Sequence, residues 1–255
     1  MSEFMLQTEN LGISFGGLKA VQDVNLKIRH KELYGLIGPN GAGKTTVFNM
    51  LTGVYLPTTG RFFLDGEDLT GRSTIDISHR GISRTFQNIR LFSNLSVIDN
   101  VLVGMTNRTP CSMFESIFRL PRHYRTEKEL RAAARELLDV FDLDGERRTL
   151  ASNLPYGKQR KLEIARALAT NPKMLLLDEP AAGMNPHETA ELTETIRFVR
   201  DRFDMTILLF EHDMSLVSGL CDSATVLNFG VTLAQGKTAD VLHDPDVIRA
   251  YLGDD

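Results

Sequence analysis

A glycine-rich stretch, GPNGAGKTT at residues 38–46, limits the possible folds of this chain more than any other segment. It follows the apolar run 33–37 and leads into a second apolar run, 47–51, which stops at Gly53. This order predicts a buried strand, a tight turn and a helix. A strand, a turn and a helix together are the context in which such a stretch binds phosphate.

The stretch also fits the phosphate-loop pattern G-x-x-x-x-G-K-[ST]. Gly41 and Gly43 allow backbone angles that side chains forbid, so successive N–H groups can point at an anion. Lys44 is placed to reach the outer phosphates of a nucleotide, and the Thr45 hydroxyl is placed to hold Mg²⁺. The predicted nucleotide-binding residues of this loop are Gly38, Pro39, Asn40, Gly41, Ala42, Gly43, Lys44, Thr45 and Thr46.

Composition describes a globular chain that does not resemble a nucleic-acid-binding protein. The 255 residues are 42% hydrophobic and 24% charged, with a net charge of −4, whereas a nucleic-acid surface is normally basic. No apolar run approaches the roughly 20 residues that span a bilayer, and the N-terminus lacks the regions of a signal peptide. We interpret Cys111 and Cys221 as reduced thiols of a cytoplasmic protein, each a small buried hydrophobe.

The segments around the phosphate loop alternate apolar and polar residues. Residues 4–11 and 24–29 are predicted to be antiparallel strands, and 61–69 a hairpin with a turn at Asp65-Gly66. Phe15 lies between the first two segments. Two interpretations stay open for it: its ring stacks on a nucleotide base, or it continues the apolar face of Ile13.

The middle of the chain changes from a strand-like to a helical pattern. A strand is predicted over 82–86, and it ends at Gln87. From about 91 to 150 apolar residues recur at helical spacing, which predicts a helical subdomain inserted into an α/β core. Thr126 and Glu129 predict a capping box for its last helix. Six basic residues favour a solvated helix face, with a membrane-proximal face as the alternative: Arg119, Arg122, Arg125, Lys128, Arg131 and Arg135.

The segment 154–168 closes this insert with a helix that is predicted to start at Gly157. Lys158, Arg160 and Lys161 fall in its first turn, where the helix dipole favours acidic residues. Either a partner brings an anion to these cations, or they are exposed and hydrated.

Two later apolar runs are predicted to be buried parallel strands that end in polar residues. The run 174–177 is followed by Asp178 and Glu179, and the run 206–210 precedes His212. The carboxyl ends of parallel strands are where ligands bind. Asp178 suits a Mg²⁺ shell, and Glu179 suits the orientation or deprotonation of an attacking water.

The remaining segments complete the core. Asn185 is predicted to cap a helix that Pro186 opens and that runs to about residue 202. Short strands are predicted over 224–229 and 231–235, with a helical, polar tail from Thr238.

These motifs together resemble an ATP-binding cassette (ABC) ATPase of a membrane transporter. The resemblance covers about residues 5–253 and rests on five ordered motifs. They are the phosphate loop, Gln87 as the Q-loop, LPYGKQ at 154–159 as the signature, MLLLDEP at 174–180 as Walker B, and His212 as the switch histidine. The resemblance implies a single ABC domain over 5–253. Its α/β fold has a phosphate-loop core with a parallel sheet, an antiparallel β subdomain and an inserted α-helical subdomain over 91–160.

The family mechanism implies a role for each motif. Two such subunits sandwich two ATP molecules, and Tyr156, Gly157 and Lys158 of one chain contact the nucleotide held by the other. Glu179 activates water, and His212 touches the γ-phosphate. The Mg²⁺ ligands implied are Thr45, Gln87 and Asp178. Gln87 also reports the state of the site to the membrane subunits through the helical insert.

A narrower resemblance is to the ATP-binding subunit of high-affinity branched-chain amino acid importers. It rests on YGKQRKLEIARAL, DEPAAGMNP, EHDMSLV and the tail PDVIRAYLG. The resemblance implies permease partners, a second ATP-binding subunit that is identical or different, an indirect extracytoplasmic solute-binding protein, and no nucleic acid. The chain would then be a peripheral protein on the cytoplasmic face of the bacterial inner membrane.

Two residues depart from the general family pattern. Pro155 replaces the signature serine that normally contacts the γ-phosphate, and Asn185 replaces the usual Asp of the D-loop. The alternatives to branched-chain amino acid import are an ATPase for urea, short amides or a lipid-like substrate, a soluble ABC protein that acts on DNA or ribosomes, and a nucleotide-gated scaffold without catalysis.

Overall fold

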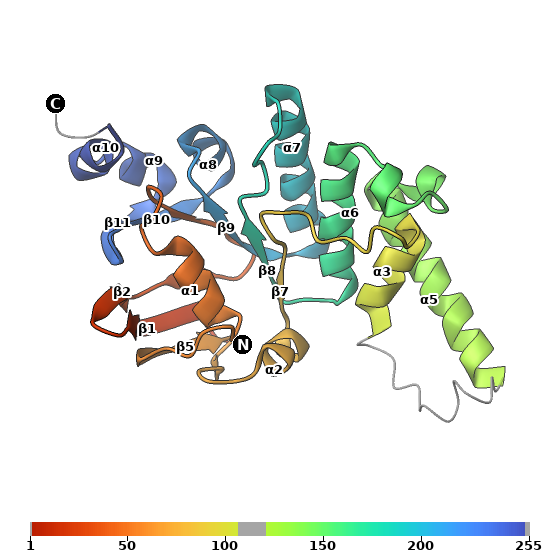
Figure 1. Cartoon of the computed structure of the whole chain (residues 1–255), viewed down its shortest axis with the longest axis horizontal. Coiled ribbons are helices and arrows are strands. Elements are labelled where there is room, and N and C mark those ends of the chain that lie inside the picture. The colour runs from red at the N-terminus through yellow and green to blue at the C-terminus, as the bar shows by residue number, and fades with distance from the viewer. Residues whose placement is uncertain (1, 107–120, 253–255) are drawn as a thin grey trace. The chain divides into compact units, whose positions relative to one another are not determined.

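The computed structural model describes residues 2–106 and 121–252, apart from the side chains of 121–125 and 252. The chain divides into two compact units, residues 1–84 with 173–255 (unit 1) and Thr85–Pro172 (unit 2). In Figure 1 the red-to-orange and the teal-to-blue elements belong to unit 1, and the yellow-to-green helices belong to unit 2.

Unit 1 contains a six-stranded sheet in the order β11-β10-β4-β9-β8-β7. The first pair is antiparallel, and the other neighbours are parallel. The predicted strands of this sheet are confirmed, although β7 ends two residues before the predicted boundary. The strands are β4 (Leu33–Ile37), β7 (Ile82–Arg84), β8 (Met174–Asp178), β9 (Thr206–Glu211), β10 (Ser223–Asn228) and β11 (Val231–Lys237).

A second, antiparallel sheet in unit 1 has the order β2-β1-β5-β6, with β3 also paired to β1. The predicted pairing of residues 4–11 with 24–29 is confirmed in β1–β3, and the predicted hairpin in β5–β6. The prediction missed β2, because Gly16-Gly17 forms only a short turn before the chain pairs again with β1. The strands are β1 (Phe4–Phe15), β2 (Leu18–Val24), β3 (Lys27–Arg29), β5 (Thr59–Leu64) and β6 (Glu67–Asp68).

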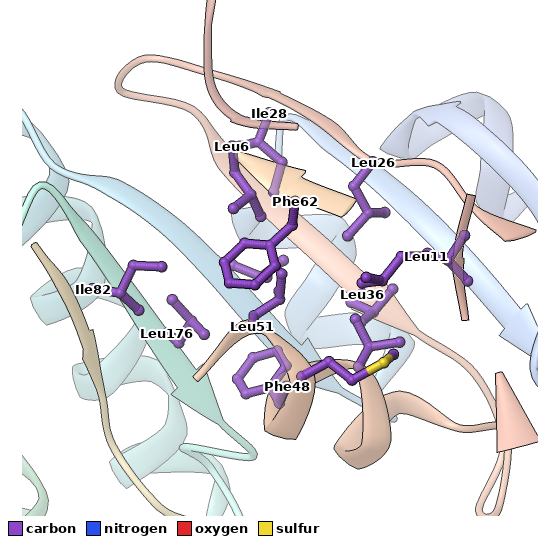
Figure 2. Close-up of a cluster of buried hydrophobic side chains, with 14 of the residues drawn as sticks. Leu6, Leu11, Leu26, Ile28, Leu36, Phe48, Leu51, Phe62, Ile82 and Leu176 are labelled. Carbon is purple, nitrogen blue, oxygen red and sulfur yellow. The ribbon is translucent and has the colours of Figure 1, made fainter. Parts of the chain in front are cut away.

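The helix α1 (Lys44–Leu51) packs between the two sheets of unit 1. Its Phe48 and Leu51 are fully buried with Phe62 of the antiparallel sheet and Leu36 and Leu176 of the parallel sheet. Figure 2 shows the Phe62 ring beside Leu51 in this cluster. Burial of a large apolar side chain contributes about 1.5–3 kcal/mol, so this cluster fixes the helix that follows the phosphate loop.

The other helices of unit 1 are α2 (Thr74–Arg80), α7 (Pro186–Phe203), α8 (Met214–Leu220), α9 (Thr238–Leu242) and α10 (Pro245–Leu252). The predicted start of α7 is confirmed. The Asn185 side chain accepts from the N–H groups of His187 and Glu188, and the Glu188 carboxylate accepts from the Asn185 N–H. Cys221, after α8, is buried as predicted, and burial raises the pKa of its thiol.

Unit 2 is helical, as the spacing of its apolar residues predicts. It contains α3 (Val97–Met105), the long green helix α5 (Pro121–Val140) and α6 (Tyr156–Ala169), with short 3₁₀ turns at Asp144–Glu146 and Ala151–Asn153. The predicted capping box is wrong. Thr126 lies inside α5, whose first residue is Pro121, and proline suits that position because it needs no N–H partner there.

Part of the sequence pattern lies outside this description. The part of the predicted helical pattern that falls on residues 107–120, together with Cys111 and Arg119, is not among the described residues. The single-domain boundaries 5–253 and the subdomain boundaries 91–160 stay predictions. Across residues 2–106 and 121–252, no helix is both long and apolar enough to cross a membrane.

Candidate functional site

The phosphate loop surrounds a cavity of about 420 Å³ in unit 1. Gly38 and Gly43 have positive φ angles of 150° and 98°. A Cβ on Gly38 would lie 2.1 Å from the carbonyl oxygen of Leu227, so only glycine fits there. The cavity lining contains Asn40, Gly41, Ala42, Gly43, Lys44, Thr45 and Thr46, with Glu179, Phe210, Phe229 and residues 18–20. The predicted loop residues from Asn40 to Thr46 therefore share one cavity.

Lys44 is the buried cation of this cavity. Its Nζ donates to the carbonyl oxygens of Gly38 at 2.5 Å and Pro39 at 2.9 Å. It also lies 5.2 Å from the centroid of the Phe210 ring. Burial lowers the pKa of the Lys44 ammonium, and the charges of Glu179, Glu211 and Asp178 oppose this shift. The loop thus orders its own lysine at the cavity wall.

Asp178 ends β8 and forms a buried ion pair. Its Oδ2 accepts from Arg84 Nη2 at 2.6 Å, and Arg84 Nη1 donates to Asn49 Oδ1 at 2.8 Å. The Arg84 guanidinium also lies over the Phe48 ring of α1. Arg84 therefore links the end of β8 to the helix that follows the phosphate loop.

Glu179 and His212 come together at the carboxyl ends of β8 and β9. His212 Nδ1 lies 3.7 Å from Glu179 Oε1, and Glu179 adopts a positive φ of 42°. Non-glycine residues in this region are strained and cluster at functional sites. The Glu179 N–H donates to the Phe210 carbonyl at 2.9 Å, which holds this turn against β9.

Glu211 is a third carboxylate at the same place, and it is almost fully buried. Its Oε2 accepts from the N–H groups of His212 at 3.1 Å and Asp213 at 3.4 Å, and its Oε1 accepts from the Ala181 N–H at 3.4 Å. Burial raises the pKa of Glu211, and these three hydrogen bonds oppose the shift. Glu211 connects the turn after Glu179 with the turn that carries His212.

Phe15 does not contribute to the cavity lining among the residues that the structure describes. Its ring is 46% exposed and packs edge-on against Tyr55, with 5.3 Å between the ring centroids. Base stacking by Phe15 stays a prediction. Phe229, which is 83% exposed and lines the cavity, is the aromatic ring that the sequence pattern missed.

The predicted signature and Gln87 lie in unit 2. The helix α6 begins at Tyr156, one residue before the predicted start, and Tyr156, Gly157 and Lys158 form its first turn. Gln87 belongs to the loop between β7 and α3, and its carbonyl oxygen accepts a hydrogen bond from Arg160. Unit 2 therefore presents two separate predicted nucleotide-contacting segments.

The prediction that the cations of this turn lack an anion within the chain is wrong. Lys158 pairs with Glu146, and Arg160 pairs with Glu163 at 2.7 Å. The prediction that Arg160 is exposed is also wrong, because its side chain is 0% exposed. A carboxylate one turn later and a carboxylate in the 3₁₀ turn Asp144–Glu146 supply charge that the helix dipole alone does not account for.

Sequence reasoning assigned no role to Arg84, Glu211 or Glu163. Glu211 directly followed a predicted strand, a position that suggests contact with the site, whereas Arg84 fell inside the predicted strand 82–86 and carried no such signal. Glu163 lay on a helix pattern, where a charged residue is usually solvated. Its backbone partners, the N–H groups of Phe86 and Arg90, lie more than 70 residues earlier and approach it only in the folded chain.

A phosphate loop, a cavity beside it and two acidic residues at the end of a parallel strand of the same sheet define a nucleotide-binding protein of the phosphate-loop class. A family model described as "ABC transporter" matches residues 21–182, more than half of the chain. A second, described as "Branched-chain amino acid ATP-binding cassette transporter", matches residues 231–255. The chain belongs to the ABC transporter family and is an ATP-binding cassette ATPase.

Relatives match over the full length. The chain is 46% identical over 254 residues to the high-affinity branched-chain amino acid transport ATP-binding protein LivG of Escherichia coli (strain K12). It is 44% identical over 254 residues to BraF of Pseudomonas aeruginosa, which has the same description. Both matches cover 100% of each chain. The predicted family and fold class are confirmed.

A solved structure also matches. The ADP conformation of MJ1267, an ATP-binding cassette of an ABC transporter, superposes with a TM-score of 0.85 at 30% identity. The match covers 99% of this chain and 100% of that one.

Proposed function

We propose that this protein is the ATP-hydrolysing subunit that energises import of branched-chain amino acids through a membrane permease. The observation that carries the proposal is the cavity in which the phosphate loop and Glu179 face the same space. Full-length similarity to LivG and BraF supports the choice of solute. We place the protein peripherally, on the cytoplasmic face of the bacterial inner membrane.

The side chains of the cavity divide the chemistry. The loop N–H groups and the start of α1 bind the phosphates, since a helix N-terminus attracts anions. Lys44 exchanges its loop carbonyls for the outer phosphates. Glu179 orients or deprotonates the attacking water, and His212 contacts the γ-phosphate. Glu211 keeps the turns that carry these two residues in register.

The oxygen donors near the loop suit Mg²⁺, which prefers hydroxyl and carboxylate oxygens. Thr45 lines the cavity, and Asp178 ends β8 of the same sheet. We propose that these residues and Gln87 hold the ion, which neutralises charge on the phosphates when it is bound. Arg84 keeps the Asp178 carboxylate in a fixed orientation for this role.

A second ATP-binding subunit completes each site. We propose that Tyr156, Gly157 and Lys158 contact the nucleotide bound by the partner, whether the partner is a copy of this chain or a different one. Pro155 supplies no hydroxyl for that contact, so the backbone of the first turn of α6 must provide it. A solute-binding protein outside the cell is the indirect third partner.

We place the permease contact at a groove of about 630 Å³ in unit 2. Arg90, Phe92, Val103 and Arg166 line it, and Phe92 and Val103 are partly exposed. An apolar patch rimmed by cations suits a partner segment that carries both apolar and acidic residues. The groove adjoins the loop that carries Gln87, which would let the permease sense that residue.

The test is uptake of radiolabelled leucine in cells that lack this chain and are complemented with variants. We expect wild-type protein and an exposed-site control, Glu136→Gln, to restore uptake. Glu179→Gln is expected to abolish it while the protein accumulates normally. Phe92→Asp is expected to hydrolyse ATP but lose the permease in affinity purification. Full leucine uptake with Glu179→Gln contradicts the assigned function.

A further inference from the structure

The loop after β7 is held by a buried ion pair that no motif of the chain explains. The Arg160 guanidinium donates through Nη1 to the Phe86 carbonyl oxygen and through Nη2 to the Gln87 carbonyl oxygen, both at 2.8 Å. The same Nη1 donates to Glu163 Oε2 at 2.7 Å. One planar guanidinium therefore connects two consecutive carbonyl groups with a carboxylate, an arrangement that a lysine does not reproduce.

Glu163 binds backbone N–H groups of the same loop, whereas Arg160 binds its carbonyl groups. Its Oε1 accepts from the Arg90 N–H at 3.2 Å and from the Phe86 N–H at 3.5 Å. The loop lies outside the regular strands and helices, and buried backbone groups need partners. The pair Arg160–Glu163 thus supplies donors and acceptors that regular secondary structure would otherwise supply.

The far end of the loop is held in the same way from a second helix. Asn100 of α3 is fully buried, and its side chain bonds both the N–H and the carbonyl of Phe92, at 2.9 Å and 3.1 Å. Two helices of unit 2 therefore fix the backbone conformation of the segment from Phe86 to Phe92.

The energetics favour a positioning role over a purely stabilising one. A buried ion pair is often no better for stability than apolar residues of the same volume, because both charges lose their hydration. Its advantage is a defined geometry. Here that geometry is imposed on the residue that the proposed function assigns to Mg²⁺, Gln87.

We infer that Arg160 and Glu163 are positioning residues that fix Gln87 relative to the first turn of α6. Arg160 lies one turn after Tyr156, and its Nη2 lies 3.5 Å from the Tyr156 hydroxyl. A displacement of this turn by the partner's nucleotide passes through the guanidinium to the Gln87 backbone. This inference rests on the proposed roles of Gln87 and of the signature turn.

The first test is hydrogen–deuterium exchange of the complete protein, which measures the protection of the loop amides independently of ATPase activity. Arg160→Lys keeps the charge but loses the fork that holds the Glu163 carboxylate, which accepts from the Phe86 and Arg90 amides. We therefore expect these two amides to exchange about tenfold faster or more, the effect of one weakened hydrogen bond to a charged group. The core strands are expected to keep their protection. Arg135→Lys is the matched control, because Arg135 pairs with Asp144 at the surface. Unchanged exchange at both amides overturns the inference.

The second test is ATP hydrolysis against Mg²⁺ concentration in the assembled transporter. We expect Arg160→Lys to raise the half-maximal Mg²⁺ concentration by about tenfold. The affinity for ATP without Mg²⁺ should stay within about twofold of wild type, because Arg160 shares no partner with the phosphate loop and the two contribute independently. In a Gln87→Ala background, Arg160→Lys should add less than about twofold, since both changes remove the same function. If the double variant shows the product of the two single-variant increases in the half-maximal Mg²⁺ concentration, the inference is overturned.

Glu163→Gln repeats both measurements with the volume kept and the charge removed, and it decides the inference if Arg160→Lys does not fold. A Gln87→Ala variant with an unchanged dependence of ATP hydrolysis on Mg²⁺ contradicts the proposed Mg²⁺ role of Gln87. The exchange experiment still decides whether the ion pair holds the loop.

Discussion

Two buried ion pairs, one in each unit, have similar geometry and different surroundings. Arg84 and Asp178 of unit 1 lie 2.6 Å apart, and Arg160 and Glu163 of unit 2 lie 2.7 Å apart. Arg84 also bonds the Asn49 side chain, and Asp178 adjoins Glu179 at the end of β8. Arg160 and Glu163 instead bond the backbone of a single loop.

The difference shows how one kind of interaction serves two purposes. A carboxylate whose partner is a side chain can exchange or share that partner with a ligand at small cost in structure. An ion pair that bonds several backbone groups cannot rearrange without freeing the chain, and it therefore defines a conformation. We expect residues of the first kind to control chemistry and residues of the second kind to control shape.

The largest effect is expected at the cavity of unit 1. Glu179→Gln removes the positioned base, so turnover should fall by about 10²–10⁴-fold. The unfolding midpoint and ATP affinity should stay close to those of the Glu136→Gln control. Phosphate release and nucleotide binding check both statements. Turnover within twofold of the control would remove Glu179 from the chemistry.

Removal of one carboxylate from each ion pair tests the comparison directly. Glu163→Ala leaves Arg160 buried and unpaired, so unfolding by urea should show a loss of about 3–5 kcal/mol. Asp178→Asn keeps the shape and reduces the negative charge near Glu179 and Glu211, so its loss of stability should be clearly smaller. Equal losses in the two variants would break the comparison.

The pH dependence of stability isolates Glu211. Burial raises its folded pKa above the ordinary value, so the stability that it contributes is present below that ordinary value and is lost as pH rises through the raised pKa. Relative to Glu211→Gln, wild-type protein should lose part of its stability as pH rises through this range. Urea unfolding at several pH values measures the difference. A constant difference across the range would contradict the raised pKa.

The smallest effect is expected at the Lys158–Glu146 pair. Both side chains are about one-third exposed, so Lys158→Met should change stability by less than about 1 kcal/mol. Thermal unfolding of the isolated chain checks this. A larger ATPase defect in the assembled transporter would then come from the proposed contact with the partner's nucleotide. A loss of stability as large as that of Glu163→Ala would place Lys158 with the shape-defining residues.

Local patterns predicted most of unit 1 because each of its signals is contained in a short segment. The phosphate loop needs only its glycines, Lys44 and the flanking apolar runs, and the Asn185 cap needs only Glu188 and Pro186. The same reasoning missed the burial of Arg160, because the partners that make its burial possible lie more than 70 residues earlier in the chain. It also placed a helix start at Thr126, because a four-residue capping pattern carries no information about the residues before it.

The site divides in the same way. Asp178, Glu179 and His212 were predicted at a common edge of the sheet because parallel strands align their carboxyl ends. The roles of Arg84 and Glu211 depend on which strands are neighbours, and the strand order β4-β9-β8-β7 is not encoded in any one segment.

The decisive measurement is ATP-driven leucine uptake by proteoliposomes that contain this chain with the membrane proteins that co-purify with it. The proposed function predicts uptake that requires ATP, Mg²⁺ and the solute-binding protein. It also predicts that uptake disappears when Glu179→Gln replaces the wild-type chain. ATP hydrolysis without any movement of leucine, isoleucine or valine would leave the ATPase intact and contradict the assigned substrate.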